Sequence, residues 1–309
     1  MAYSNVLEAV GNTPMVRLQR LVPPDCAQIL VKFEAVNVGG SIKTRTALAM
    51  VEAAEKAGLL KPGYTIVEAT SGNQGIGLAL VAAVKGYRCK LVMPENMSAE
   101  RQQIMRAYGA EIVLVPPGNS ITEAIQNAMA KARQIVEEEP NTWYANQFAN
   151  PENPAIHART TATEILFQAG TKIDAFCAGI GTGGTITGIG RVLKGKWPDV
   201  IIAAVEPTKA ALLSGGQISH HAMQGMGDGV MPDILDRSII DEIVLVTDED
   251  AIETARALAR LEGLLVGVSS GANTWAAIQL AKRLGPGKTV VTVLPDTGER
   301  YLSTSLFQP

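Results

Sequence analysis

The chain has 309 residues, of which 47% are hydrophobic and 18% charged, and its formal net charge is −3. This length allows two domains with a large buried core, and the slight negative charge argues against nucleic acid as the main partner. No apolar run approaches the length that crosses a membrane, and the first ten residues lack the basic start of a signal peptide, so we expect a cytoplasmic protein.

The first notable segment places a lysine directly behind two glycines. Gly39 and Gly40 precede Ser41-Ile42-Lys43, and an amphipathic segment beginning a helix follows at residues 46–50. Glycines let the backbone approach a ligand closely, and the positive end of a helix lowers the pKa of a nearby amine. These conditions suit a lysine that forms a Schiff base, although a solvated lysine in a first helical turn is the ordinary alternative.

From residue 64 onward, short β-rich runs alternate with longer helical patterns. We expect strands at 64–69, 89–93, 111–115, 175–178, 201–205, 264–266 and 289–293, and helices at 77–85, 99–108, 121–138, 154–168, 250–260 and 273–284. This alternation predicts an α/β fold with two domains, each built on a twisted, mostly parallel sheet flanked by helices. Ligands of such folds bind at the carboxyl ends of the strands.

The segment after the first of these strands is rich in hydrogen-bond donors. Thr70-Ser71-Gly72-Asn73-Gln74-Gly75 combines hydroxyls, amides and two glycines between a strand and a helix. Such a concave set of N–H and O–H groups suits a carboxylate. The alternative is a tight turn held by local Ser and Asn hydrogen bonds.

A glycine-rich turn follows the strand expected at 175–178. Gly179-Ile180-Gly181-Thr182-Gly183-Gly184 fits the G-x-G-x-x-G pattern, and Glu206 ends the next strand, where a ribose-binding acid would lie in a nucleotide-binding protein. The pattern is short and the chain has 30 glycines, so a general phosphate-binding turn is favoured over a specific nucleotide-binding motif. Exposed N–H groups at a helix start bind a phosphate.

Gly267-Val268-Ser269-Ser270-Gly271 fits the G-x-S-x-G pattern of hydrolases, which needs a histidine later in the chain. All three histidines precede Ser269, so the hydrolase interpretation fails. Ser269 is then either a helix N-cap, which the pattern slightly favours, or a hydroxyl offered to a ligand.

No metal site is expected. The pair His220-His221 has no Glu or Cys at ligand spacing, and Cys26, Cys89 and Cys177 form no C-x-x-C motif. A loop is the simpler interpretation of the histidine pair.

Taken together, these segments resemble the fold-type II family of pyridoxal-phosphate enzymes, in its cysteine synthase and cystathionine β-synthase branch. The resemblance covers nearly the whole chain and rests on several long motifs in the same order. They are Gly11-Asn12-Thr13-Pro14, Gly39-Gly40-Ser41-Ile42-Lys43, Thr70-Ser71-Gly72-Asn73, Met93-Pro94-Glu95-Asn96-Met97-Ser98 with Arg101, Asn146-Gln147-Phe148, Gly181-Thr182-Gly183-Gly184-Thr185, Ser269-Ser270-Gly271 and Pro295-Asp296-Thr297-Gly298-Glu299-Arg300-Tyr301.

The resemblance implies a role for each group of residues. Lys43 would form the internal aldimine with pyridoxal 5'-phosphate, Asn73 would bond the ring hydroxyl and Ser269 would face the pyridine nitrogen. The phosphate would be held by Gly181, Thr182, Gly183, Gly184 and Thr185. The substrate would be held, mainly through its carboxylate, by Thr70, Ser71, Gly72, Asn73, Gln74 and Gln147.

The resemblance further implies a fold like that of the tryptophan synthase β subunit. Residues 1–41 and 147–309 would form a larger cofactor-binding domain, and 42–146 a smaller mobile domain that closes over the substrate. The implied reaction is a β-replacement through an α-aminoacrylate, with L-cysteine made from O-acetylserine and sulfide as the leading possibility. A homodimer, and binding of a serine acetyltransferase C-terminal peptide in the cleft, are also implied.

Four positions depart from the family pattern: Gln74 for Thr, Thr44 for Asp, Ala162-Thr163 for Gly-Pro, and Asp228 for a small residue. Asp228 matters most, because a carboxylate beside the second substrate could activate water or a thiol, or bind a cationic group. The alternative is a solvated loop residue. As the base, it would favour a cystathionine β-synthase-like enzyme or a cysteine hydrolyase that releases hydrogen sulfide. The altered Asn loop leaves a 2,3-diaminopropionate synthase as a further alternative.

Overall fold

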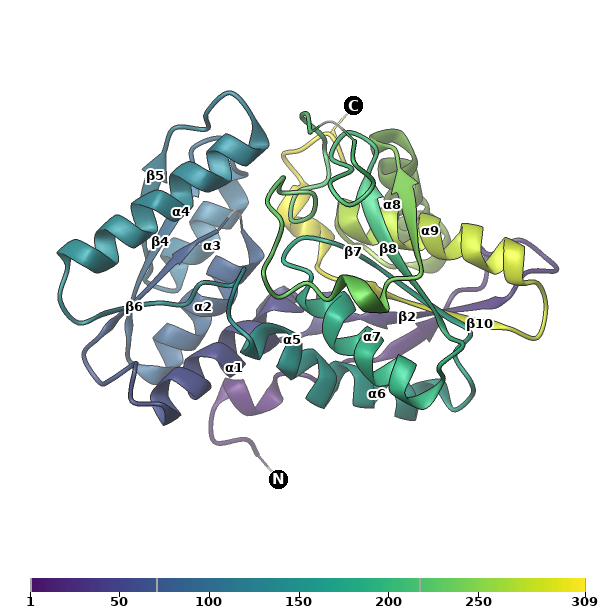
Figure 1. The fold of residues 1–309 in the computed structure, drawn as a ribbon, viewed down its shortest axis with the longest axis horizontal. Helices are drawn as coiled ribbons and strands as arrows, with labels where there is room; N and C mark the ends of the chain where they lie inside the picture. The colour runs from purple at the N-terminus through teal and green to yellow at the C-terminus, as the bar shows by residue number, and fades with distance from the viewer. Residues whose placement is uncertain (1, 71, 217, 309) are drawn as a thin grey trace.

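The computed structural model describes residues 2–70, 72–216 and 218–308. Two α/β units lie side by side (Figure 1), and residues of both line one pocket. Each is a mostly parallel sheet with helices on both faces, so the predicted fold class is confirmed. Separate hydrophobic cores fill both sides of each sheet.

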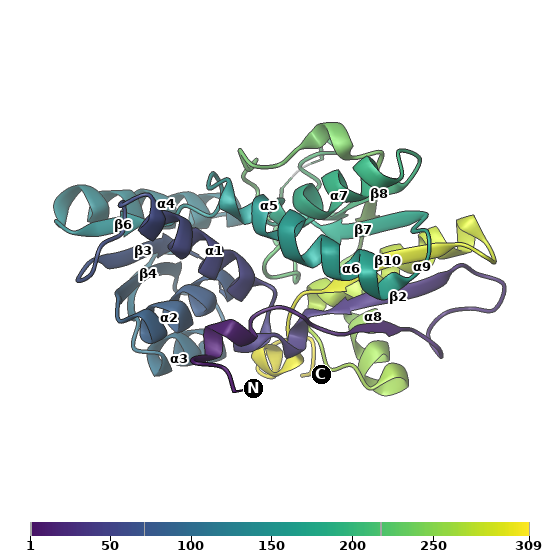
Figure 2. The same ribbon diagram turned by 90° about the horizontal axis from the view of Figure 1, so that it is seen from below.

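The larger sheet has six strands in the order β1-β2-β10-β7-β8-β9, and only β1 runs antiparallel to its neighbour. The strands are β1 (Met15–Arg17), β2 (Gln28–Phe33), β7 (Ala175–Gly179), β8 (Ile201–Pro207), β9 (Glu242–Val246) and β10 (Thr289–Leu294). Helices α6 (Ala162–Ala169) and α7 (Gly184–Lys196) cover one face, and α8 (Asp248–Glu262) and α9 (Val268–Leu284) lie on the other (Figure 2).

The smaller sheet has four parallel strands in the order β5-β4-β3-β6. They are β3 (Thr65–Ala69), β4 (Arg88–Pro94), β5 (Glu111–Val115) and β6 (Thr142–Tyr144). Helix α4 (Ile121–Glu138) covers one face, while α1 (Lys43–Lys56), α2 (Asn73–Lys85) and α3 (Ala99–Ala107) lie on the other side. Every residue of β3 and of β10 is buried, as expected for parallel strands with both faces covered.

The predicted domain boundaries stay a prediction, although they agree with how the strands are distributed. All four strands of the smaller sheet lie within 42–146, and all six strands of the larger sheet lie within 1–41 or 147–309.

The structure corrects several expected elements. Residues 264–266 form no strand and contribute only one bridge, between Val266 and Thr297. The helix expected at 154–168 is divided into α5 (Glu152–Ile156), a π-helical turn (His157–Thr161) and α6. Helices α2 and α9 begin four and five residues earlier than expected, at Asn73 and Val268, so both glycine-containing loops continue directly into helices.

Candidate active site

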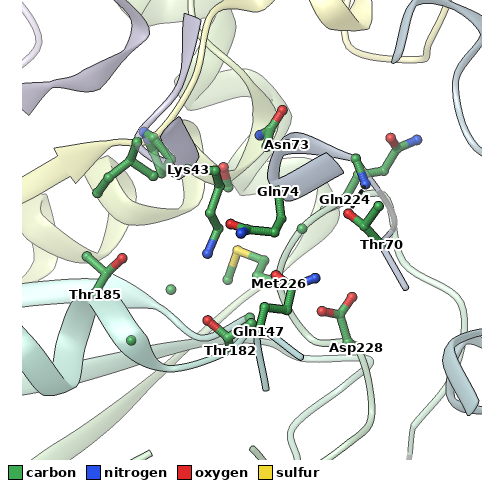
Figure 3. Close-up of a pocket in the computed structure, with 18 of the residues that line it drawn as sticks. Lys43, Thr70, Asn73, Gln74, Gln147, Thr182, Thr185, Gln224, Met226 and Asp228 are labelled. Atoms are coloured by element: carbon green, nitrogen blue, oxygen red, sulfur yellow. Dashed lines mark hydrogen bonds between the residues drawn. The ribbon is translucent and has the colours of Figure 1, made fainter. Parts of the chain in front are cut away.

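A pocket of about 950 Å³ of empty space, partly open to solvent, lies where the carboxyl ends of β3, β7 and β10 meet. It is lined by every predicted site residue within the described ranges (Figure 3). These residues are Lys43, Thr70, Gly72, Asn73, Gln74, Gln147, Gly181, Thr182, Gly183, Gly184, Thr185, Asp228 and Ser269. Ser71, also predicted, lies outside the described residues. Segments more than 200 positions apart in the sequence therefore converge on one site.

Lys43 is the first residue of α1 and extends into this pocket (Figure 3). Its backbone N–H donates to Ser41 Oγ at 3.3 Å, which holds the start of the helix. Burial lowers the pKa of the Lys43 amine to about 8, and the charge of Asp228 opposes part of this shift. Roughly a tenth of the amine is therefore neutral, and so nucleophilic and basic, at pH 7, far more than for an ordinary lysine.

The glycine-rich turn after β7 forms a tight cradle at the start of α7. Gly183 is the N-cap with φ of +77°, and α7 begins at Gly184. A Cβ at Gly184 would lie 2.0 Å from Asn153 Oδ1, and one at Gly181 would lie 2.5 Å from the carbonyl oxygen of Gly225. Only glycine fits at these two positions, and the helix start with its free N–H groups suits an anion.

Two side chains that the sequence analysis did not single out support this cradle from behind. Asn153 Nδ2 donates to Thr182 Oγ1 at 3.0 Å, and His157 Nε2 lies 3.4 Å from Thr185 Oγ1. Burial lowers the pKa of His157 well below its ordinary value, and the charges of Lys43 and Arg45 lower it further. His157 is therefore a neutral partner for the Thr185 hydroxyl.

The loop between β3 and α2 is held by its own side chains as well as facing the pocket. Thr70 Oγ1 accepts the N–H groups of Gly72 at 3.0 Å and Gly75 at 3.3 Å. Gln74 accepts a hydrogen bond from Thr46 at 2.6 Å, so its amide oxygen is already partnered. Gln147 Nε2 donates to the carbonyl of Ala69 at 3.1 Å, which places this amide beside the loop.

Ser269 is the second residue of α9, and Gly267 occupies the N-cap position. The N-cap interpretation of Ser269 is therefore wrong. Its buried side chain lines the pocket.

Asp228 lies in a loop whose neighbouring glycines, Gly225, Gly227 and Gly229, all have positive φ. Its side chain points into the pocket (Figure 3). Burial raises the pKa of the Asp228 carboxyl, while the charges of His221, Lys43 and Arg101 act in the opposite direction. The carboxylate is thus a stronger base than an ordinary aspartate.

The loop that carries Asp228 is fastened by His221. Its Nε2 lies 3.1 Å from the carbonyl of Gly227, and its Nδ1 accepts the N–H of Met223 at 3.2 Å. Both ring nitrogens are therefore occupied by hydrogen bonds to the loop backbone. Among the residues that the structure describes, no group of three His, Cys, Asp or Glu side chains is placed to hold a metal ion.

A second cavity, the outer chamber, adjoins the pocket and contains about 1020 Å³ of empty space. It lies between the loop at 220–228 and the segments at 94–97 and 117–125. The two cavities share Ile125, Gln224, Gly225, Met226 and Asp228. Asp228 therefore lines both the chamber and the pocket.

Other residues in or beside the pocket were given no role in the sequence analysis, although Arg101, Asp296 and Tyr301 belonged to its motifs. Arg101, from α3, donates to Gln224 and, at 2.9 Å, to Tyr301. Asp296 accepts the amide N–H of Asn73 at 2.6 Å. A usable signal existed for Asp296, since an acidic residue just beyond a largely apolar strand stands where α/β proteins bind ligands.

Comparison with known proteins gives a consistent result. The family model described as "Pyridoxal-phosphate dependent enzyme" matches residues 6–296. A cysteine synthase from Staphylococcus aureus is 51% identical over 304 residues, covering 98% of this chain and 96% of that protein.

Solved structures with the same fold include an O-ureido-L-serine synthase and a hydrogen sulfide-producing enzyme from Fusobacterium nucleatum. The first has a TM-score of 0.94 and 44% identity, covering 99% of this chain and 96% of that one. The second has a TM-score of 0.93 and 41% identity, covering 97% and 100%. The chain belongs to the family of pyridoxal-phosphate dependent enzymes, in its cysteine synthase branch.

Proposed function

We propose that this enzyme carries out β-replacement on a serine-derived amino acid and that its main reaction forms L-cysteine from O-acetylserine and sulfide. The observation that carries the proposal is the convergence, in one pocket, of a lysine whose pKa is lowered to about 8, an anion cradle and a donor-rich loop. The 51% identity to a protein named cysteine synthase supports the choice of reaction.

The residues present fit pyridoxal phosphate. The cradle of residues 181–185 supplies a helix start and two threonine hydroxyls for the phosphate, with glycine at the positions where a Cβ would collide. Asn73 would face the ring oxygen and Ser269 the ring nitrogen. The bound cofactor withdraws electrons from Cα of the amino acid, which loosens the Cα proton and the group on Cβ.

Lys43 would hold the cofactor and then act as the proton carrier. Its neutral Nζ would take the proton from Cα of the amino acid and would return that proton after the nucleophile has added at Cβ. Ser269 offers a hydroxyl where a carboxylate would hold a proton on the ring nitrogen. The weaker electron withdrawal suits a reaction in which the β-substituent leaves promptly.

The substrate carboxylate would be held by the loop after β3. Thr70, Gly72, Asn73 and Gln74 line the pocket there, and Gln147 lies beside them. We propose that Ser71 also contacts the substrate carboxylate. Closing the unit of residues 42–146 over the bound amino acid would exclude water from the reacting atoms.

The proposal is tested by adding O-acetylserine, serine and cysteine separately to the purified holoenzyme and following its visible absorption. We expect O-acetylserine to change the spectrum fastest, and sulfide to restore the original spectrum while L-cysteine accumulates. A spectrum that responds to cysteine but not to O-acetylserine would contradict L-cysteine synthesis as the main reaction.

A second candidate function is supported by Asp228, whose side chain lines both the pocket and the outer chamber. There its carboxylate could take the proton from water or from an amino-acid thiol, giving hydrogen sulfide release from cysteine or cystathionine formation. The similar structure from Fusobacterium nucleatum is described as a hydrogen sulfide-producing enzyme. An amine nucleophile, as in 2,3-diaminopropionate synthesis, would need the same base.

Asp228→Asn separates the two candidates. We expect it to slow reactions with water or homocysteine by ~10²-fold, the lower end for loss of a general base, because these nucleophiles must lose a proton. Addition of sulfide, which is largely ionised, should be almost unchanged. Asp233→Asn, at an exposed position in the same loop region, is the matched control. Equal loss with every nucleophile would indicate a structural role for Asp228.

We also propose a cytoplasmic homodimer. The homodimer is what the family resemblance implies, and the free cysteines support a reducing compartment such as the cytoplasm. No helix in the described part of the chain is long and apolar enough to cross a membrane. Sedimentation would test the dimer. Competition between O-acetylserine and a synthetic serine acetyltransferase C-terminal peptide would test whether such a peptide enters the cleft.

A further inference from the structure

The segment after β10 contacts the pocket side chain Asn73 at both ends of its amide. Asn73 Nδ2 donates to Asp296 Oδ2 at 2.6 Å, and Arg300 Nη1 donates to Asn73 Oδ1. Asp296 and Arg300 are both buried, with 0% and 3% of their surface exposed. Asn73 belongs to the smaller unit, whereas Asp296 and Arg300 belong to the larger one. They lie 223 and 227 residues from Asn73 in the sequence.

The chemical nature of these two partners fixes the orientation of the Asn73 amide. An asparagine amide has an acceptor end and a donor end of almost the same shape, so neutral neighbours can accommodate it either way round. A carboxylate accepts only, and a guanidinium donates only. With Asp296 on one side and Arg300 on the other, the carbonyl oxygen must face Arg300 and the amide nitrogen must face Asp296.

Further contacts hold these two partners in place. Tyr301 Oη donates to Asp296 Oδ2 at 2.7 Å, and Arg101 Nη2 donates to Tyr301 Oη at 2.9 Å. Arg300 Nη2 also donates to the carbonyl of Gly39. Ile42 N donates to the carbonyl of Pro295 at 2.9 Å, immediately before Lys43. The segment therefore holds Asn73 and the start of α1 in one arrangement.

We propose that Asp296 and Arg300 are positioning residues that orient the Asn73 amide so that its second N–H, not its oxygen, is presented to the ring oxygen of the cofactor. The inference rests on the proposed contact between Asn73 and that ring oxygen. A donated N–H stabilises the ionised ring oxygen, whereas a reversed amide would present a carbonyl oxygen and repel it. The ionised form of the lysine-bound cofactor absorbs in the visible and the un-ionised form in the near ultraviolet.

The test measures the ratio of visible to near-ultraviolet absorbance of the bound cofactor in purified holoenzyme variants. Asp296→Asn keeps the shape but replaces the obligate acceptor with a group that pairs either way. We expect the visible-to-near-ultraviolet ratio to fall about two- to tenfold, the effect of one hydrogen bond. Arg300→Gln should lower the ratio similarly, while Arg300→Lys, which only donates, should retain most of it. Glu299→Gln, the same charge change as Asp296→Asn at an exposed neighbour, is the control and should leave the ratio unchanged.

A double-mutant cycle distinguishes orientation from general damage to the fold. If Asp296 acts through Asn73, adding Asp296→Asn to Asn73→Ala should not lower the ratio further. Fully additive effects, or an unchanged ratio in both Asp296→Asn and Arg300→Gln while Asn73→Ala lowers it, would overturn the inference. An unchanged ratio in Asn73→Ala would instead refute the proposed Asn73 contact, and the inference with it. If Asp296→Asn does not fold, the Arg300 pair decides the question by the same criteria.

Discussion

Lys43 and Asp228 face one pocket, and each shifts the acid–base behaviour of the other. Burial lowers the pKa of the lysine to about 8 and raises that of the aspartate, while their mutual attraction opposes both shifts. Burial is the larger effect for both groups. Each is thereby closer to a neutral form at working pH, which is the condition for moving protons efficiently.

Replacing Lys43 by alanine tests the central assignment. We expect Lys43→Ala to abolish turnover and the covalent attachment of the cofactor. After borohydride reduction, gel filtration in denaturant should separate the cofactor from the variant chain but not from the wild-type chain. Stability should fall little, because Lys43 lines a cavity. Lys56→Ala, at the exposed end of the same helix, should behave as wild type. Normal turnover by Lys43→Ala would refute the assignment.

At the scale of elements, the start of α7 depends on glycines, whereas its end does not. The helix begins at Gly184, in contact with Asn153, and ends near Gly195, around which there is open space. The same substitution at the two ends should therefore have opposite effects.

We expect Gly184→Ala to weaken cofactor binding at least ~10-fold, because the new Cβ would lie 2.0 Å from Asn153 Oδ1 and must displace the cradle. Gly195→Ala should keep wild-type affinity and stabilise the protein by about 0.5–1 kcal/mol. Titration of the apoenzyme with pyridoxal phosphate, together with thermal unfolding, measures both. Equal affinity for pyridoxal phosphate in the two variants would show that the turn and Asn153 can move to accommodate the new Cβ without weakening cofactor binding.

Strand β3 carries a buried acid, Glu68, whose carboxylate accepts the N–H groups of Ala69 at 2.9 Å and Gln147 at 3.1 Å. Burial raises its pKa to about 8, although these two hydrogen bonds act in the opposite direction. In the unfolded chain the group titrates near 4.5. Its contribution to stability is therefore fully present below pH 4.5 and is lost as the pH rises through 8.

Glu68→Gln should remove this pH dependence. Between pH 5 and pH 8 the wild-type free energy of unfolding should fall relative to that of the variant, by up to about 3.5 kcal/mol. Urea unfolding at both pH values provides the measurement, with the exposed Glu111→Gln on β5 as the control. Parallel pH curves for wild type and Glu68→Gln would show that Glu68 is already ionised at pH 5.

Across the whole molecule, the sequence predicts correctly the elements and motifs that depend on residues close together in the chain. Both ends of β5 and of α4 were predicted correctly, since each has a clear apolar period and Ser120 caps α4. The Lys43 segment and the glycine turn were identifiable for the same reason, because each stands at the start of a helix.

Features decided by tertiary contacts were missed. Strand β2 contains Lys32, a charge in a fully buried position that makes sense only beside Glu164, 2.7 Å away. The hydrogen bonds of Asp296 and Arg300 to Asn73 join segments more than 220 residues apart. Local pattern carries no information about such pairs, and only the assembled fold places them together.

The two units are joined by a buried ionic network centred on Arg45. This guanidinium, 2% exposed on α1, donates to Glu34 at 2.9 Å and to Glu164 on α6 at 2.6 Å. Lys32 pairs with Glu164 as well. The pKa of Glu164 is lowered to about 2: burial acts to raise it, but the hydrogen bonds and charges of Arg45 and Lys32 prevail. Removing Arg45 would leave Glu34, which is fully buried, without its ionic partner.

We therefore expect Arg45→Met to lower the free energy of unfolding by about 3–5 kcal/mol, the usual effect of leaving a buried charge unpaired. Arg159→Met removes an exposed pair with Glu152 and should cost less than about 1 kcal/mol. Urea unfolding at equal cofactor occupancy compares the two. Similar small losses in both would mean that water reaches Glu34 once Arg45 is gone. In that case packing across the interface, and not the ionic network, would hold α1 against the larger unit.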